Sequence, residues 1–541
     1  MEAKAWNRWP ALALAGVLLV AVSLRAVLVA TGQRYLRSDE AVVGLMAKHI
    51  VTRGERPIFL YGQPYGGGHA IEAYLTAPLF AAFGRSAMIL TGVSAAISVV
   101  CIALAWMALW RASDALTATA GALLYACSPP AVYQSVLVNG GNAAIALALG
   151  ALLCFLSVSG GGRRAATRVA AAGLLSGLAC WAMDYTIVYP AAFCLLWVMG
   201  GEENRWRRIG LFAIAFAVGC SPMIVYDLAH GLAHARRMLG GEAGVGTALT
   251  DRFVGSLWFV CRYGLAAFFS GELDDFVPSA IGPGAWLHAA VASGALVWMA
   301  IRERREIGMA ARRCLGTMEG GVPLSMVPMI FVVLYLVLYA AAKFSLNRTP
   351  RYLLPLCPFI SMVIAQAATW RRQRWGRAIG LVVIGALVAR GAWVSLAVNS
   401  RDWHEEHRIR TSGPEVVALA RRLEERGIRT VIAPYEIQWR LLFETDERVI
   451  AASDMLSGLP RYAFYTEEVR RRLAAGEAVA LVVRSDMAFA RLWSRGPGLL
   501  FRLRVDPAVL SGRAEVLGGR YDRFVIFYPL TSADLEQMMG G

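Results

Sequence analysis

The sequence predicts a polytopic α-helical membrane protein that carries a small α/β domain at its C-terminal end. Hydrophobic residues make up 57% of the 541 residues, and the mean hydropathy is +0.50, which excludes an ordinary soluble protein. Apolar runs long enough to cross a bilayer recur up to residue 398. From about Asn399 the chain is charged and shows the shorter periodicities of a soluble domain.

The apolar runs define a membrane region of about eleven spans. They lie near residues 10–31, 86–110, 115–137, 140–159, 169–183, 186–200, 209–226, 284–301, 322–342, 353–369 and 377–398. The region 169–200 is long for one span and short for two. The first run is long for the apolar core of a signal peptide and lacks a clear cleavage site, so we interpret it as a retained signal anchor.

The arginines predict the orientation of these spans. A net charge of +16 would also suit a nucleic-acid partner, but the arginines group in short stretches between apolar runs, so we expect none. These stretches are 163–164, 205–208, 302–305 and 371–374. With Lys4 and Arg8 inside, all four stretches lie in the cytoplasm, and the loops 32–85, 184–185, 227–283 and 343–352 lie outside. An odd number of spans then places the C-terminal domain outside the cytoplasmic (inner) membrane.

We therefore expect a membrane domain over residues 1–398 and an extracytoplasmic α/β domain over 399–541. The first outer loop, 32–85, carries two helical patterns that predict interfacial helices near 38–50 and 67–83. In the C-terminal domain we expect a helix at 414–426 that ends at Gly427, a helix at 466–474, and strands at 429–433, 448–452, 478–483 and 523–528. No cysteine follows Cys357, so disulfides do not hold this domain together.

The adjacent acids Asp39 and Glu40 are the most informative feature of the chain. They lie a few residues beyond the first span, where ionisable groups are costly to bury and are functional candidates. Val42 and Met46 follow at helical spacing, so a helix begins here, with Ser38 as the expected N-cap. Its dipole would keep the acids ionised. An ordinary acidic first turn is the structural alternative.

Further unusual polar residues fall in the predicted outer segments. They are His69 and Glu72 in the first loop, Asp184 and Tyr185 in the apolar region 169–200, Arg262 in the long outer loop 227–283, and Lys343, Arg348, Arg351 and Tyr352 before the tenth span. A charge at the centre of a bilayer costs about 2.5–3.5 kcal/mol, so Asp184 is expected in an outer turn or a polar cavity. Acids and arginines facing one compartment suit a phosphate-bearing donor and a hydroxyl acceptor, with a carboxylate as base.

Three short motifs resemble the GT-C glycosyltransferases, in particular the branch of protein O-mannosyltransferases and lipid A aminoarabinose transferases. The motifs are the runs 35–40, 61–67 and 351–355, which read YLRSDE, YGQPYGG and RYLLP. The resemblance implies an enzyme that takes a sugar from a polyprenyl-phosphate carrier outside the cytoplasmic membrane. It implies inversion at the anomeric carbon with Asp39 as the general base, and Asp184 as a second acid that positions the acceptor or the donor sugar. The arginine- and alanine-rich composition is typical of a high-GC bacterium and favours undecaprenyl phosphate as the carrier.

The chain departs from the family pattern in its first loop. Relatives often carry a basic residue there, close to the donor phosphate, whereas the stretch with Gln63 and Tyr65 has none. This shifts phosphate binding towards Arg351 and Tyr352, with Arg348, Lys343 and Arg262 in reserve. Some relatives bind a divalent metal; His69 and Glu72 have workable spacing, but two ligands do not identify a site. The cofactor requirement, the sugar and the acceptor (lipid, glycan or protein) stay open.

Other classes of function remain as alternatives. In a transporter or lipid flippase the same outer acids would form a proton or substrate pathway, but the sequence shows none of the repeated halves typical of transporters. A non-enzymatic scaffold would leave the acidic pair unexplained. Several residues can also be explained by a purely structural role. Arg351 and Tyr352 suit an interfacial anchor, Arg25 and Arg390 suit snorkelling, and Tyr435, Glu436 and Trp439 suit a folded core.

Overall fold

The computed structural model describes most of the chain. The described residues are 8–31, 36–61, 70–135, 141–158, 163–200, 204–233, 235–236, 249–271, 281–314, 322–341, 350–370, 374–398, 413–453, 462–484, 514–518 and 523–530. The chain forms two compact units. We call Met1–Thr31, Tyr65–Ile71 and Thr91–Asn399 the membrane unit, and Gly32–Pro64, Glu72–Leu90 and Ser400–Gly541 the loop unit. The first loop therefore packs with the C-terminal residues.

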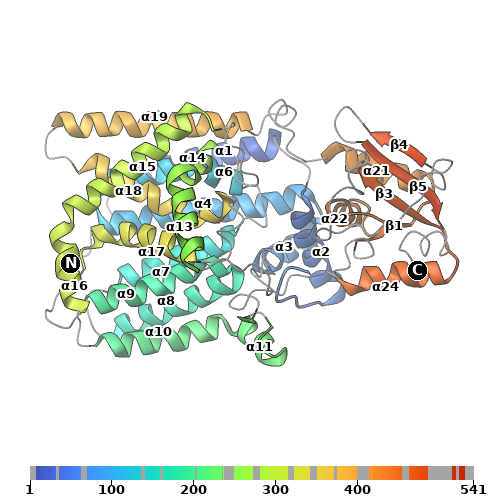
Figure 1. The fold of residues 1–541 in the computed structure, drawn as a ribbon, viewed down its shortest axis with the longest axis horizontal. Coiled ribbons are helices and arrows are strands. Elements are labelled where there is room, and N and C mark those ends of the chain that lie inside the picture. The colour runs from blue at the N-terminus through green and yellow to red at the C-terminus, as the bar shows by residue number, and fades with distance from the viewer. Residues whose placement is uncertain are drawn as a thin grey trace. The chain divides into compact units, whose positions relative to one another are not determined.

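The protein is a multi-pass helical membrane protein, as the sequence predicts. Among the described residues, eight helices are long and apolar enough to cross a membrane, or ten if two bent pairs each form one span. The α-helices described up to residue 398, apart from those of the first loop, include both these candidate spans and shorter helices. They are α1 (Arg8–Thr31), α4 (Ala87–Ala112), α5 (Ala115–Cys127), α6 (Pro129–Ser135), α7 (Asn142–Leu156), α8 (Arg163–Ala182), α9 (Val188–Met199), α10 (Arg205–Gly219), α11 (Ser221–Ala229), α13 (Leu249–Phe259), α14 (Leu265–Ser270), α15 (Pro283–Arg302), α16 (Arg304–Cys314), α17 (Val327–Ala341), α18 (Cys357–Thr369) and α19 (Arg374–Val398). Figure 1 shows α19 along one side of the membrane unit and α10 along the opposite side.

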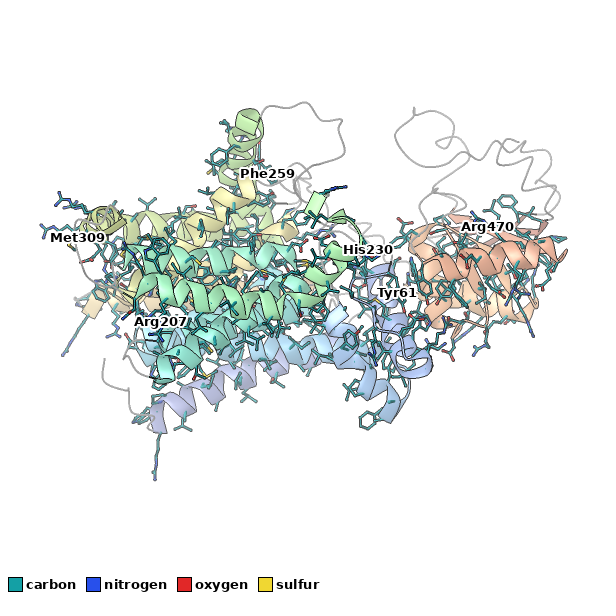
Figure 2. All side chains as sticks on the ribbon, turned by 90° about the horizontal axis from the view of Figure 1, so that it is seen from below. Tyr61, Arg207, His230, Phe259, Met309 and Arg470 are labelled. Carbon is teal, nitrogen blue, oxygen red and sulfur yellow. The ribbon has the colours of Figure 1, made fainter. Side chains whose placement is uncertain are left out.

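Each predicted apolar run coincides with a helix or a bent pair. The run 115–137 is α5 and α6, which meet at 61°, and the run 209–226 is α10 and α11, which meet at 68°. One apolar helical segment was missed. Residues Phe253–Ser270, which the sequence prediction assigned to an outer loop, are long and apolar enough to span. Their first helix, α13, runs across the direction of α19 (Figure 1), and Phe259 marks it where it stands out from the bundle (Figure 2).

Small residues let the helices of the membrane unit approach closely. Helix α8 packs against α10, and a Cβ atom on Gly177 would lie 2.1 Å from the carbonyl oxygen of Phe216. On the facing helix, a Cβ on Gly219 would lie 2.2 Å from the carbonyl oxygen of Leu174. Neither glycine tolerates a side chain, because backbone contact rather than side-chain packing joins the two helices, as is common in membranes.

Arg25 does not snorkel, contrary to the sequence expectation. Its side chain is 2% exposed. Nε donates to Ser98 Oγ at 2.5 Å and Nη1 donates to the carbonyl oxygen of Ala126 at 3.1 Å. Ala126 lies in the last turn of α5, just before the break to α6, where helix carbonyls lack partners within the helix. The arginine therefore stabilises the broken end of this helix.

The variant Arg25→Lys is expected to lower the thermal unfolding midpoint in detergent. Lysine keeps a buried cation but lacks the fork of donors that reaches both Ser98 and Ala126. Leaving one buried acceptor without its partner costs about 1–3 kcal/mol. The exposed Arg8→Lys change serves as the control, and equal midpoints for the two variants would contradict a structural role of Arg25.

The loop unit contains the predicted α/β fold. Its elements are α2 (Ser38–Arg53), most of α3 (Ala70–Phe83), α21 (Gly413–Glu425), β1 (Thr430–Ile432), α22 (Tyr435–Glu444), β2 (Ile450–Ala452), α24 (Ala463–Ala474), β3 (Val479–Arg484), β4 (Ala514–Gly518) and β5 (Arg523–Leu530). The described strands form one sheet in the order β2-β1-β3-β5-β4. Strand β1 is parallel to β2 and β3, and β5 is antiparallel to both of its neighbours. All four predicted strands are present; β4 and α22 were not predicted.

Helix α2 is a buried helix. Every residue from Glu40 to Ala47 is buried, and a run of this length includes all faces of a helix, so this part of α2 is covered on every side. The main partner is α22, which contacts α2. A Cβ on Gly44 would lie 2.5 Å from Cε2 of Phe443, so glycine permits the close approach of the two helices.

Candidate functional site

Asp39 lies in the first turn of α2 and is partly buried. The Tyr435 hydroxyl donates a hydrogen bond to Asp39 Oδ1. Next to it, Ser38 Oγ donates to the carbonyl oxygen of Glu436 at 2.8 Å. The start of α2 is therefore joined to the start of α22, and the carboxylate of Asp39 lies at this junction.

Glu40 has a different environment from Asp39. Its side chain is 2% exposed, and Oε2 accepts the backbone N–H of Arg37 at 2.8 Å. Arg37 is the N-cap residue, so the prediction that Ser38 caps the helix is wrong: the Ser38 hydroxyl donates to α22 instead. A glutamate that reaches back to the N-cap backbone closes the first turn of a helix. The geometry thus favours a structural role for Glu40.

The membrane unit brings four predicted site residues onto two neighbouring turns. Asp184 and Tyr185 begin the 3₁₀ turn η1 (Asp184–Ile187), which separates α8 from α9. Arg351 and Tyr352 lie in the 3₁₀ turn η6 (Pro350–Leu356), which contacts η1. Asp184 is partly buried, while Arg351 is exposed. The Tyr335 hydroxyl donates to the carbonyl oxygen of Tyr352 and ties η6 to α17.

Arg262 lies in a segment that contacts η6. It is exposed in the π-helical segment η2 (Val260–Gly264), with its guanidinium carbon 4.9 Å from the ring centre of Trp258. A Cβ on Gly264 would lie 3.6 Å from Cδ1 of Leu353 in η6. Single π-helical turns inside α-helices are frequent at functional sites. Three separate segments of the chain thus place Asp184, Arg351 and Arg262 on adjoining turns.

The structure says less about the remaining site residues that the sequence predicts. Gln63, Tyr65, His69, Lys343 and Arg348 lie outside the described residues. Glu72, on α3, is 1% exposed. Within the described ranges, no group of three or more His, Cys, Asp or Glu side chains is placed to hold a metal ion.

Sequence reasoning missed a second polar cluster in the loop unit. We call it the Glu447 cluster; it comprises Glu447, Lys48, His49, Arg53 and Tyr465. His49 Nε2 lies 3.1 Å from both carboxylate oxygens of Glu447, and Lys48 Nζ lies 2.6 Å from Oε2. Arg53 Nη2 donates to Oε1 at 2.7 Å, and the Tyr465 hydroxyl donates to Oε1 at 2.9 Å. Burial alone would raise the pKa of Glu447, but the hydrogen bonds from His49 and Lys48 outweigh it and lower the pKa well below its ordinary value.

A second carboxylate extends this network. Glu55 Oε1 accepts a hydrogen bond of 2.6 Å from the Tyr462 hydroxyl, and Oε2 accepts one from Tyr61. The Tyr61 hydroxyl also lies 3.0 Å from His49 Nδ1. Burial and the neighbouring Glu55 carboxylate raise the pKa of Tyr462 to about 12. The first loop and the C-terminal residues are therefore joined at both ends of α2.

Comparisons with known proteins identify the fold. No protein-family model matches the sequence, and no curated protein matches it. The structure is similar to ArnT from Cupriavidus metallidurans bound to undecaprenyl phosphate, with 13% identity and a TM-score of 0.61, over 96% of this chain and 98% of that chain. It is also similar to the Archaeoglobus fulgidus oligosaccharyltransferase in complex with zinc and sulfate, with 13% identity and a TM-score of 0.52, over 88% of this chain and 68% of that one.

The oligosaccharyltransferase AglB from Archaeoglobus fulgidus, in complex with an inhibitory peptide and a dolichol-phosphate, matches with 12% identity and a TM-score of 0.50, over 90% of this chain and 70% of that chain. The chain has the fold of the GT-C membrane glycosyltransferases. The likeness to ArnT extends over nearly the full length of both chains. The GT-C fold expected from the three short motifs is thereby confirmed.

Proposed function

We propose that the protein is a membrane glycosyltransferase that transfers a sugar from a polyprenyl-phosphate carrier to an acceptor hydroxyl outside the cytoplasmic membrane. The observation that carries the proposal is the environment of Asp39, an ionisable carboxylate in the first turn of α2, hydrogen-bonded by Tyr435 in a chain with the GT-C fold. A carboxylate in this position can take the proton of an acceptor hydroxyl, which is the task of a general base.

The similar solved structures support an isoprenoid phosphate as the carrier. One contains undecaprenyl phosphate and another contains a dolichol-phosphate. The arginine- and alanine-rich composition of this chain favours undecaprenyl phosphate. The acceptor would be a lipid, a glycan or a protein with a free hydroxyl.

In the proposed reaction, Asp39 takes the proton of the acceptor hydroxyl as its oxygen attacks the anomeric carbon of the sugar. The bond between that carbon and the phosphate oxygen breaks, the polyprenyl phosphate leaves, and the configuration inverts. Arg351 and Tyr352 would hold the leaving phosphate, with Arg262 on an adjoining turn, because cations stabilise the charge that develops there. Asp184 and Tyr185 would position the sugar or the acceptor.

The test is an assay of the purified protein in lipid nanodiscs with undecaprenyl-phosphate-linked sugars. We expect acceptor-dependent release of undecaprenyl phosphate. In the variant Arg351→Gln, the KM for the donor should rise about 10- to 100-fold, because one charge-assisted contact with the phosphate is lost. Arg421→Gln, an exposed position on α21, is the control. If the wild-type protein neither binds undecaprenyl phosphate nor releases it from any donor, the proposed function is wrong.

A further inference from the structure

We propose that Tyr435 is a positioning residue for Asp39, so that the C-terminal α/β fold supplies part of the catalytic apparatus. This inference rests on the proposed function, in which Asp39 is the general base. The Tyr435 hydroxyl donates to Asp39 Oδ1, although the two residues are 396 positions apart in the sequence. The bond limits rotation of the carboxylate and thereby sets the direction in which Oδ2 points.

The backbone around Tyr435 is held rigidly. Tyr435 is the first residue of α22 and follows β1 after only two residues. All three residues of β1 are buried, and the strand is paired with β2 on one side and β3 on the other. The ring of Tyr435 also packs edge-on against Trp439, which is fully buried, with 6.2 Å between ring centres. A phenol anchored in this way has little freedom to leave the carboxylate.

The position of Tyr435 in the sheet is typical of a functional residue. In open α/β sheets, ligands bind beyond the carboxyl ends of the parallel strands, at the N-termini of the helices that follow. Tyr435 stands at the carboxyl end of β1 and at the N-terminus of α22. The carboxylate that it contacts, Asp39, belongs to the first loop.

Helices α2 and α22 run parallel, with their N-termini together. At one end Ser38 and Asp39 bond to Glu436 and Tyr435, and at the other end Lys48 bonds to Glu447. Two helix N-termini therefore place partial positive charge beside one carboxylate. The other charged side chains in the first turns are Arg37, Glu40 and Glu436.

The structure offers a matched control at the opposite end of the helix pair. The Tyr462 hydroxyl donates to Glu55 at 2.6 Å, so it too is a tyrosine bonded to a carboxylate of the first loop. Glu55 has no place in the proposed chemistry. The variants Tyr435→Phe and Tyr462→Phe each remove one hydroxyl and keep the ring, so both would weaken the packing of the loop unit, while only the first would alter Asp39.

The experiment measures kcat, the donor KM and the unfolding midpoint of both variants with an undecaprenyl-phosphate-linked sugar. For Tyr435→Phe we expect kcat to fall about 10-fold, with the donor KM unchanged. For Tyr462→Phe we expect a lower unfolding midpoint with the kcat and donor KM of the wild type.

Two results would overturn the inference, and they are distinguishable. A Tyr435→Phe variant with wild-type kcat, or with a loss that matches Tyr462→Phe and tracks stability alone, would show that Tyr435 is only structural. A wild-type protein without sugar transfer would refute the proposed function itself, and the inference with it.

Discussion

Replacing Asp39 with asparagine is expected to lower the rate of sugar transfer by a factor of about 10² to 10⁴, the usual contribution of a general base. Asparagine has the shape of aspartate, and its amide oxygen can still accept the hydrogen bond from Tyr435. The variant should therefore fold normally while losing the group that takes the proton. The measurement compares initial rates of transfer from an undecaprenyl-phosphate-linked sugar for variant and wild type, with unfolding midpoints alongside.

A substitution of the neighbouring acid, Glu40, tests which member of the acidic pair is the base. Glutamine at position 40 can still accept the Arg37 N–H and close the first turn of α2. We therefore expect Glu40→Gln to retain most of the wild-type rate. Near-normal transfer by Asp39→Asn, or equal losses for the two variants, would contradict the assignment of Asp39 as the base.

Glu447→Leu is expected to destabilise the loop unit by about 3–5 kcal/mol, the usual cost of removing one partner from a buried ion pair. The change leaves His49, which is fully buried, the ammonium of Lys48 and the guanidinium of Arg53 without their shared carboxylate. Limited proteolysis and thermal unfolding in detergent would measure the effect. Glu468→Gln is a control, because Glu468 pairs only with arginines of its own helix in the contacts that the structure describes. Unchanged protease resistance of Glu447→Leu would contradict the prediction.

The same carboxylate makes stability depend on pH. Because the pKa of Glu447 is lowered in the folded protein, the unfolded chain binds more protons at acidic pH. Its contribution is fully present above the unfolded pKa of about 4.3 and is lost as the pH falls towards the lowered value. The wild-type protein should thus lose stability below about pH 4.3, and Glu447→Leu should show a weaker acid dependence.

The sequence was informative where the signal is local. Spanning helices were predicted because hydropathy is a property of consecutive residues, and β1, β2, β3 and β5 because each is a short apolar run. Helices α13 and α14 were missed because Arg262 and other polar residues interrupt their apolar pattern. Strand β4 is five residues long and stands at the sheet edge, where little burial shapes its sequence.

Only part of the candidate site could be predicted from local patterns in the sequence. Asp39 was identified because an acid beside a span is costly, and Asp184 because it interrupts an apolar run. The partners of the first loop could not be identified in the same way. Tyr435 pairs with Asp39, and Glu447 with His49, across 396 and 398 positions, and no local pattern of hydrophobicity or charge carries information about pairing at that separation.

The parallel pairing of α2 with α22 has a practical consequence for deletion experiments. Cleaving the chain near residue 400 would not release a removable appendage from an otherwise intact protein. It would strip α2 of its packing partner α22 and remove Phe443, whose ring lies against Gly44. Loss of activity after such a deletion would then report the collapse of the first loop, whatever else the C-terminal residues bind.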